Sequence, residues 1–195
     1  MLKKTILLLG IAIFAFQNSN AQNYREFIAL HELYQSTDGH NWKNSWDLNA
    51  PIETWEGVTV KDGHVVALDL SDNNLKGKIP ATLVNLKYLI HLNLSGNALR
   101  GKLPGQLARL KKLAFFDVSE NAIAGKIPNS IGKMAKLKSL QLSGNDFGDY
   151  SGLETIQQHQ LVAFDMDQEF KYLELMDANA FGRMTDIKFE DSKNN

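Results

Sequence analysis

The sequence contains no cysteine, and this absence limits how the chain can be stabilised and anchored. No disulfide can hold the fold together, although exported proteins commonly use such bonds. A lipoprotein anchor needs a cysteine at its cleavage site, so the chain has no lipid attachment of that kind. The folded state must therefore be stabilised by packing.

An excess of charge of one sign is also missing. The 195 residues include 21 lysines and arginines and 22 aspartates and glutamates, which gives a formal net charge of −1. Duplex-binding proteins usually carry a large basic excess, so we do not expect nucleic acid as the main partner. The apolar content of 44% and the charged content of 22% indicate an ordinary folded protein.

The longest apolar run lies at the N-terminus and is too short to span a bilayer. Two lysines in residues 1–4 precede an apolar stretch over residues 5–16, and residues 17–21 are polar or small. A membrane-spanning helix needs about 20 apolar residues, whereas this order is typical of a secretory signal peptide. We expect cleavage after Ala21 and a secreted or periplasmic chain from Gln22, without a membrane span. Export without cysteine favours a bacterial origin.

What the sequence does have is an internal repeat of 24 residues. Five sets of positions recur every 24 residues: one of asparagine, two of apolar residues, one of glycine and one of proline, and we call each set a column. Their members are Asn73, Asn97, Asn121 and Asn145; Leu68, Leu92, Phe116 and Leu140; Leu70, Leu94, Val118 and Leu142; Gly77, Gly101 and Gly125; and Pro80, Pro104 and Pro128. A fixed period of this kind is typical of solenoids. One more step predicts a fifth strand over residues 161–166.

The repeated positions have a physical explanation in a stacked coil. Alternation along a strand places Leu68 and Leu70 inside and Asp69 outside, so stacked copies predict a parallel sheet over a leucine core. The asparagine amide can donate to and accept from backbone groups that a turn leaves unpaired. Glycine suits a sharp bend or a close approach, and proline fixes the backbone before the return segment.

The spacing L-x-x-L-x-L-x-x-N-x-L resembles the leucine-rich repeat. The added segments GKIP and GKLP resemble the plant-type LxGxIP class, seen in receptor-kinase ectodomains and polygalacturonase inhibitors. Residues 29–46 and 55–71 are similar to the N-terminal cap of that class, although Val60 stands where a cysteine is usual. The resemblance covers roughly residues 24–175. It implies an α/β fold, a right-handed solenoid of about five repeats with a parallel sheet on its concave face.

We therefore expect one domain with capped ends. The predicted parts are a signal peptide (1–21), an N-terminal cap (22–64), leucine-rich repeats (65–171) and a C-terminal cap with a tail (172–195). In the first cap, Phe27, Leu30 and Tyr34 have helical spacing, and Asp62-Gly63 indicates a hairpin. The C-terminal cap is expected to be irregular, because its apolar residues do not follow the 24-residue step.

Outward strand positions on the concave face are the candidate binding site. Ile90, His91 and Phe115 form an apolar spot on a mildly acidic face, and an exposed aromatic with aliphatic neighbours is a reasonable hot spot. The other reading is that aspartate and serine at these positions only follow the repeat consensus. The candidate residues are Val66, Asp69, Ile90, His91, Asn93, Phe115, Asp117, Lys138, Gln141 and Asp165.

This face is small. Five strands project only about 400–450 Å², whereas a stable interface buries about 800 Å² per partner. We therefore expect the rims and caps to contribute to binding. A stacked solenoid commonly binds a protein or peptide on this surface, and we expect a non-catalytic module of that kind. The oligomeric state is left open.

A basic ladder on another surface offers an alternative. Lys78, Lys102 and Lys126 repeat at the 24-residue step and could hold an acidic polysaccharide or a lipid phosphate by summed charge. A solvated face copied along with the repeat is the explanation that we favour for them. Inhibition of a polysaccharide-degrading enzyme is a further alternative, implied by the family resemblance.

Catalysis, a cofactor and a metal are not expected. His91 shares its face with Ser95 and Ser119, which suggests a triad, but the serines recur with the consensus and no G-x-S-x-G turn accompanies them. The remaining histidines match no metal-ligand spacing. The acidic run Asp165, Asp167 and Glu169 lacks the glycine and the ordered oxygen ligands of a calcium loop.

Overall fold

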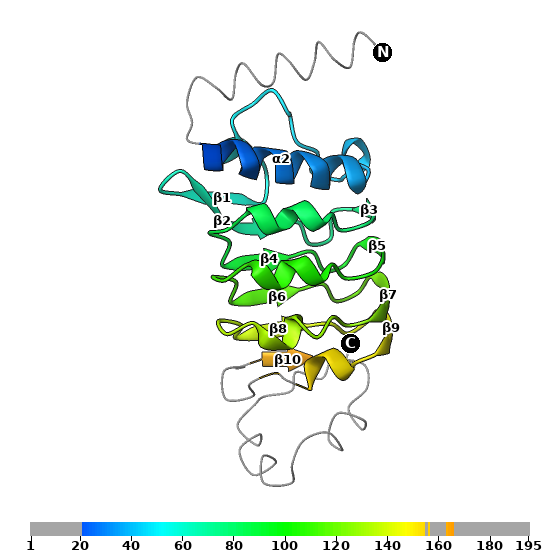
Figure 1. The fold of residues 1–195 in the computed structure, drawn as a ribbon. Coiled ribbons are helices and arrows are strands. Elements are labelled where there is room, and N and C mark those ends of the chain that lie inside the picture. Colours follow the sequence, from blue (N-terminus) through cyan, green and yellow to red (C-terminus); the bar gives the residue numbers. More distant parts are fainter. Residues whose placement is uncertain (1–20, 155, 157–162, 166–195) are drawn as a thin grey trace.

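Successive coils of the chain stack along one axis in the computed structural model, which describes residues 21–154, 156 and 163–165 (Figure 1). Helix α2 spans Ala21–Ser36 and covers one end of the stack. The expected signal peptide, apart from Ala21, and the expected C-terminal cap lie outside the described residues.

Short strands and 3-10 helices alternate along the repeats. The strands are β1 Val58–Lys61, β2 His64–Asp69, β3 Lys76–Gly77, β4 His91–Asn93, β5 Ala98–Gly101, β6 Phe115–Asp117, β7 Ala122–Lys126, β8 Ser139–Gln141, β9 Asp146–Asp149 and β10 Ala163–Asp165. The 3-10 helices are η1 Gly39–Asn41, η2 Ile52–Thr54, η3 Ala81–Asn85, η4 Gly105–Arg109, η5 Ile131–Lys133 and η6 Ser151–Leu153.

The predicted parallel sheet is present, and its register follows the 24-residue step. The strand order within the described residues is β1-β2-β4-β6-β8-β10, and every pair after the antiparallel β1–β2 pair is parallel. Leu68 lies beside Leu92, which lies beside Phe116. We call the outer surface of this sheet the sheet face.

A second sheet was not predicted from the sequence. Strands β3, β5, β7 and β9 form it within the described part of the chain, again in parallel. They are two to five residues long. The glycine column of the repeat, Gly77, Gly101 and Gly125, lies in three of them, and glycine there indicates a bend more than a strand. The apolar columns of the repeat are buried in the core, with Leu68, Leu92 and Leu140 fully inaccessible to solvent.

The asparagine column joins each coil to the next. The Asn97 side-chain nitrogen donates to the carbonyl of Leu70 at 2.9 Å on the preceding coil and to that of Leu94 at 3.0 Å on its own coil. Its Oδ1 accepts from the N–H of Leu75 at 2.9 Å. Asn121 and Asn145 repeat this pattern one and two coils further along. These asparagines belong to the scaffold.

Aromatic packing closes the N-terminal end. The Trp46 and Trp55 rings stack with their centroids 4.7 Å apart, and Trp42 meets Trp46 edge-on at 4.8 Å. Each indole N–H donates to a backbone carbonyl at 2.9–3.0 Å, so burial leaves no polar atom of these rings unpaired. Tyr34 of α2 packs against the same group.

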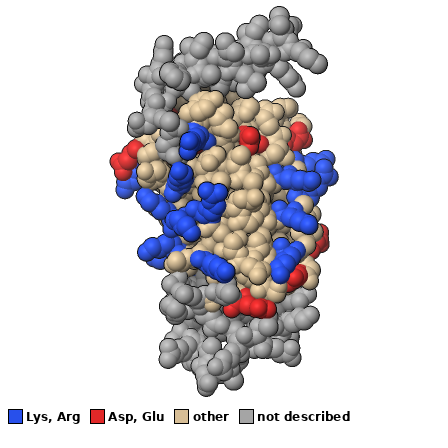
Figure 2. All heavy atoms as spheres, in the orientation of Figure 1, with Lys and Arg blue, Asp and Glu red and all other residues tan. Residues whose placement is uncertain are grey.

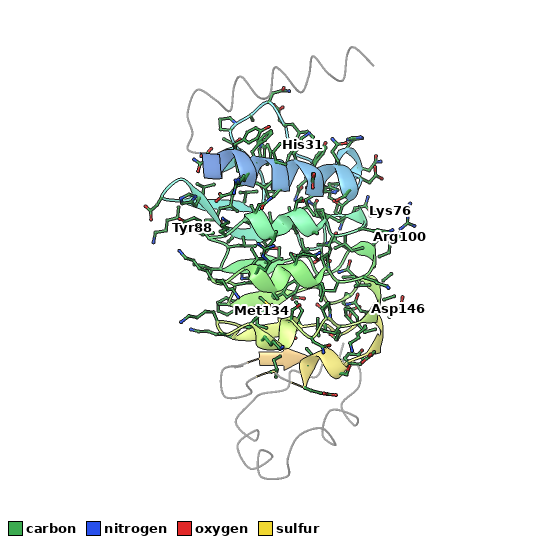
Figure 3. All side chains as sticks on the ribbon, viewed as in Figure 1. His31, Lys76, Tyr88, Arg100, Met134 and Asp146 are labelled. Carbon is green, nitrogen blue, oxygen red and sulfur yellow. The ribbon has the colours of Figure 1, made fainter. Side chains whose placement is uncertain are left out.

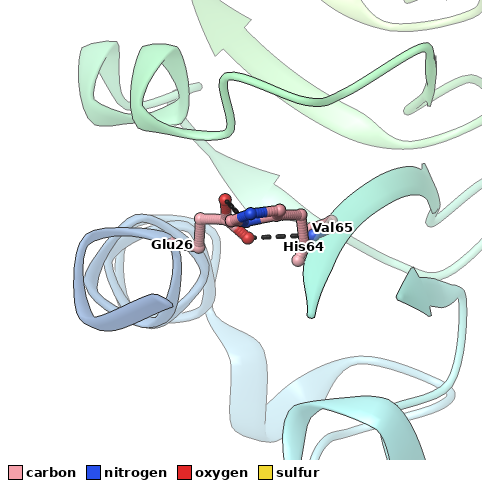
Figure 4. A network of polar contacts seen from close by, with 3 residues as sticks. All are labelled: Glu26, His64 and Val65. Carbon is pink, nitrogen blue, oxygen red and sulfur yellow. Dashed lines mark hydrogen bonds and ion pairs between the residues drawn. The ribbon is translucent and has the colours of Figure 1, made fainter. Parts of the chain in front are cut away.

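A buried carboxylate ties α2 to the hairpin (Figure 4). Glu26 is 2% exposed; its Oε2 accepts from the N–H of Val65 at 2.9 Å, and its Oε1 lies 3.1 Å from Nδ1 of His64. The hairpin turn itself uses Asp62 and Gly63, with φ values of 53° and 74°. Two successive residues with positive φ are the geometry of a tight hairpin, which Asp-Gly favours.

Candidate ligand-binding surfaces

The parallel register aligns the predicted site residues in columns on the sheet face. Ala67, His91, Phe115 and Ser139 are direct neighbours on successive strands. A second column contains Asp69, Asn93, Asp117, Gln141 and Asp165. The side chain of Asp165 lies outside what the structure describes.

Ile90, His91 and Phe115 form the apolar patch of the sheet face. Ile90 is 43% exposed and Phe115 is 40% exposed. Among the described residues, Tyr24 of α2 is the one other large hydrophobic residue that is exposed to this degree. The His91 and Phe115 ring centroids are 5.9 Å apart. Folding leaves two large apolar side chains in water on adjacent coils, where a ligand can cover both.

Two further candidates border the apolar patch. The N–H of Ile90 donates to the carbonyl of Val66 at 2.8 Å, and the N–H of Lys138 donates to that of Ala114 at 2.7 Å. These bonds place Val66 beside Ile90 and Lys138 beside the coil that carries Phe115. Lys138 is exposed, and Val66 is partly buried.

Three members of the second column, Asp69, Asn93 and Asp117, have a structural role that the sequence alone did not indicate. Oδ1 of Asp69 accepts from the N–H of Ser71 at 3.1 Å and from its hydroxyl at 2.7 Å. Asp117 makes the same two bonds to Ser119, at 2.9 and 2.6 Å, and Asn93 repeats them with Ser95. One oxygen of each side chain therefore closes a local turn at the end of its strand.

These bonds also direct the serine hydroxyls away from His91. Ser95 Oγ donates to Asn93, and Ser119 Oγ donates to Asp117, at 2.8 and 2.6 Å. A serine nucleophile needs its hydroxyl on a base that can take the proton, with a histidine in that place in the usual triad. The sheet face thus holds the residue types of a triad without the hydrogen bonds that would connect them.

The basic ladder lies at one lateral edge of the stack. A Cβ placed on Gly101 would lie 3.3 Å from Cγ of Lys78, and one on Gly125 would lie 3.7 Å from Cγ of Lys102, so each lysine stem crosses the glycine of the next coil. The third cation is paired: Lys126 Nζ lies 3.5 Å from Oδ2 of Asp149. Hydrogen bonds from Ser151 lower the pKa of Asp149, and Lys126 lowers it further.

A second group of cations, the lysine edge, was missed in the sequence apart from Lys138, which was a candidate of the sheet face. It comprises exposed side chains in the segments that lead from η3, η4 and η5 into β4, β6 and β8, namely Lys87, Lys111, Lys112, Lys136 and Lys138. Figure 2 shows basic side chains gathered along both lateral edges of the repeats. Figure 3 places Tyr88 at the edge opposite Lys76 and Arg100. The Lys112 amino group lies 4.2 Å from the centre of the Tyr88 ring, which assigns the lysine edge to the Tyr88 side.

The sequence contains the excess of basic residues that marks this edge, but the net charge of the whole chain hides it. Residues 76–138 contain twelve lysines and arginines, while their acidic residues are only Asp117 and Glu120. The balancing carboxylates lie before residue 76, with Asp69 and Asp72 in the first repeat, and from Asp146 onward. A charge count by segment would have revealed that residues 76–138 are strongly basic although the whole chain is nearly neutral.

Neither a metal nor a membrane helix is indicated where the structure is described. In residues 21–154, 156 and 163–165, no three histidine or acidic side chains cluster closely enough to hold a metal ion. No helix in the same residues is long and apolar enough to cross a bilayer.

The stacked coils define the class of repeat to which this structure belongs. Two family models, both described as leucine-rich repeat, match residues 63–123 and residues 133–154. Leucine-rich repeats are therefore found in those residues, and the parallel sheet with its short 3-10 helices is an α/β fold of the leucine-rich-repeat type. No curated protein matches the chain.

Several solved structures resemble the fold, among them the ectodomain of a plant membrane receptor kinase. The PEPR1–AtPEP1 structure is 28% identical with a TM-score of 0.65, over 73% of this chain and 21% of that one. The BIR2 ectodomain from Arabidopsis thaliana is 26% identical with a TM-score of 0.62, over 73% and 82% of the two chains. The ectodomain of GASSHO1/SCHENGEN3 from Arabidopsis thaliana, in complex with CASPARIAN STRIP INTEGRITY FACTOR 2, is 25% identical with a TM-score of 0.62, over 72% and 18%. This chain thus spans about a fifth of PEPR1 and of GASSHO1/SCHENGEN3.

Proposed function

We propose that this chain is an exported, non-catalytic binding module that recognises a protein or peptide through the concave sheet face. The observation that carries the proposal is the exposed pair Ile90 and Phe115, with His91 between them on the sheet. Fully burying an aliphatic or aromatic side chain contributes about 1.5–3 kcal/mol. Covering these two partly exposed residues would therefore supply a useful share of a modest binding energy.

Two of the similar structures support a partner of this class. PEPR1 was solved with AtPEP1, and GASSHO1/SCHENGEN3 with CASPARIAN STRIP INTEGRITY FACTOR 2. Both are much longer than this chain, so the likeness supports the kind of function and not the same ligand. The hydroxyls of Ser95 and Ser119 are bonded to Asn93 and Asp117 of their own coils, which favours binding over hydrolysis on this face.

Affinity capture from the native extracellular or envelope fraction supplies the partner for a direct test. Phe115→Asp places a charge in the middle of the apolar patch and should weaken binding of the captured partner by about tenfold to a hundredfold. Tyr24→Asp is the matched control, because Tyr24 is 41% exposed and lies on α2, which is not part of the sheet. Equal affinities of wild type and Phe115→Asp would remove the sheet face as the site.

The basic ladder supports a second candidate, binding of an acidic polysaccharide. The stems of Lys78 and Lys102 cross successive coils in line, which would present their charges to a linear polymer. The triple variant K78E/K102E/K126E should then lose binding to polygalacturonate, and wild-type binding should fall steeply with salt. A flat salt response would exclude this candidate.

A further inference from the structure

The lysine edge borders the apolar patch directly. Lys111 and Lys112 precede Phe115 on the same coil, and Lys138 is aligned with Ala114, the neighbour of Phe115. Lys87 precedes Ile90 in the same way on the preceding coil. The exposed apolar side chains and the lysines therefore form one continuous surface at the side where the chain enters β4 and β6.

No carboxylate in these segments balances the lysine edge. Residues 81–90, 105–115 and 129–139 contain no aspartate or glutamate, and Arg109 and Lys133 add two further cations there. Within the described part of the chain, none of the five lysines forms an ion pair. On the opposite edge Lys126 is paired with Asp149, whereas Lys78 and Lys102, like the lysine edge, form no ion pair with a described residue. A run of like charges repels itself, and an anionic ligand would relieve that repulsion.

Lys112 is also held in place, which is unusual for a surface lysine. The Tyr88 ring stacks on His64 with centroids 3.8 Å apart and planes within 5° of parallel, and Lys112 lies over Tyr88. His64 in turn contacts the buried Glu26. This chain of contacts fixes the Tyr88 ring against the hairpin and directs a cation along the edge.

We infer that the ligand of the sheet face is an acidic peptide segment with an apolar anchor residue. The anchor covers Ile90 and Phe115, and the flanking carboxylates lie against the lysine edge. This inference rests on the proposed function and specifies its ligand. The sheet face alone, at about 400–450 Å², is about half of the area that one partner buries in a standard interface. The lysine edge enlarges this contact surface along one whole side.

Charge and apolar surface together favour a peptide over a uniform polyanion. A polyuronate or a nucleic acid would pair with the lysines but would leave Ile90 and Phe115 uncovered or set against polar groups. A peptide side chain supplies the apolar contact and its neighbours supply the carboxylates. Exposed lysines contribute through summed charge, so the attraction should weaken as salt screens it.

A random peptide-display library selected against the purified protein tests this inference. We expect the enriched peptides to carry a net negative charge and at least one large apolar residue. A synthetic peptide of the best sequence then serves as the probe for dissociation constants at low and physiological salt. The variant K111E/K112E/K136E should weaken its binding at least about tenfold. All three sites are exposed, so the fold should be retained, which circular dichroism checks.

The matched control is K78E/K102E/K126E, which changes the net charge equally on the opposite edge. It should alter the affinity less than about threefold, because those charges are distant and screened. Enriched peptides without an acidic bias that still require Phe115 would overturn the acidic ligand and leave the proposed function standing. Failure to enrich any peptide that depends on Phe115 would contradict the proposed function itself. Polygalacturonate that binds as tightly as the peptide, even to Phe115→Asp, would identify a polysaccharide site instead.

Discussion

Replacing Asn97 with alanine measures how strongly the asparagine column stabilises the stack of coils. The substitution removes the acceptor of two backbone N–H groups, those of Asn73 at 3.0 Å and Leu75 at 2.9 Å. It also removes the donor to the carbonyls of Leu70, Leu94 and Ser95. A buried group left without its partner costs about 1–3 kcal/mol, so the two N–H groups alone give a loss of about 2–6 kcal/mol. That is at or above the upper end of ordinary single substitutions.

Asn93→Ala is the matched control on the same coil. Asn93 accepts from Ser95, which is half-buried and open to water, whereas Asn73 and Leu75 are buried, so we expect a smaller loss of about 0.5–1 kcal/mol. Urea denaturation followed by circular dichroism gives both changes in the free energy of unfolding. If Asn97→Ala falls within about 1 kcal/mol of Asn93→Ala, the column does not join the coils as described.

Three further predictions concern the cap and the last coils. Burial lowers the pKa of His31 below its ordinary 6.5, although the charge of Glu32 partly offsets this. Because the unfolded chain binds the proton more readily than the folded chain, the free energy of unfolding falls as pH drops below about 6.5. His31→Gln should flatten that fall in urea titrations between pH 7.5 and 5, and an unchanged slope would contradict it. Gly77→Ala should destabilise the protein by more than about 2 kcal/mol, because φ of residue 77 is 144° and the new Cβ would lie 2.0 Å from the carbonyl oxygen of Ser36. An unchanged melting temperature would refute this contact. Ser151→Ala should raise the pKa of Asp149 in an NMR titration, since the Ser151 hydrogen bonds that lower it include one from the hydroxyl.

The main sheet could be predicted from the sequence because its positions repeat without interruption. Leu68, Leu92, Phe116 and Leu140 differ by 24 residues each time and occupy equivalent places in β2, β4, β6 and β8. Side-chain alternation then determines which residues face outward. The columns of the candidate site follow from that register.

Other features could not be predicted in this way. The second sheet has strands such as β3, of two residues, in which neither alternation nor composition stands out. Asp69 and Asp117 close turns because each accepts from the backbone N–H two residues later. That bond depends on the backbone conformation, so the residue types alone do not distinguish a turn-closing aspartate from a ligand-binding one. The lysine edge was hidden because the whole-chain charge combines the basic segment 76–138 with acidic residues before and after it.

Hydroxyl-radical footprinting of the protein with and without its captured partner tests the central claim most directly. Oxidation of an aromatic ring reports its exposure to solvent, and Phe115 and Tyr24 begin at nearly equal exposure, 40% and 41%. We expect the partner to protect Phe115 and to leave Tyr24 as reactive as in the free protein. Full reactivity of Phe115 in the bound state would contradict recognition through the sheet face.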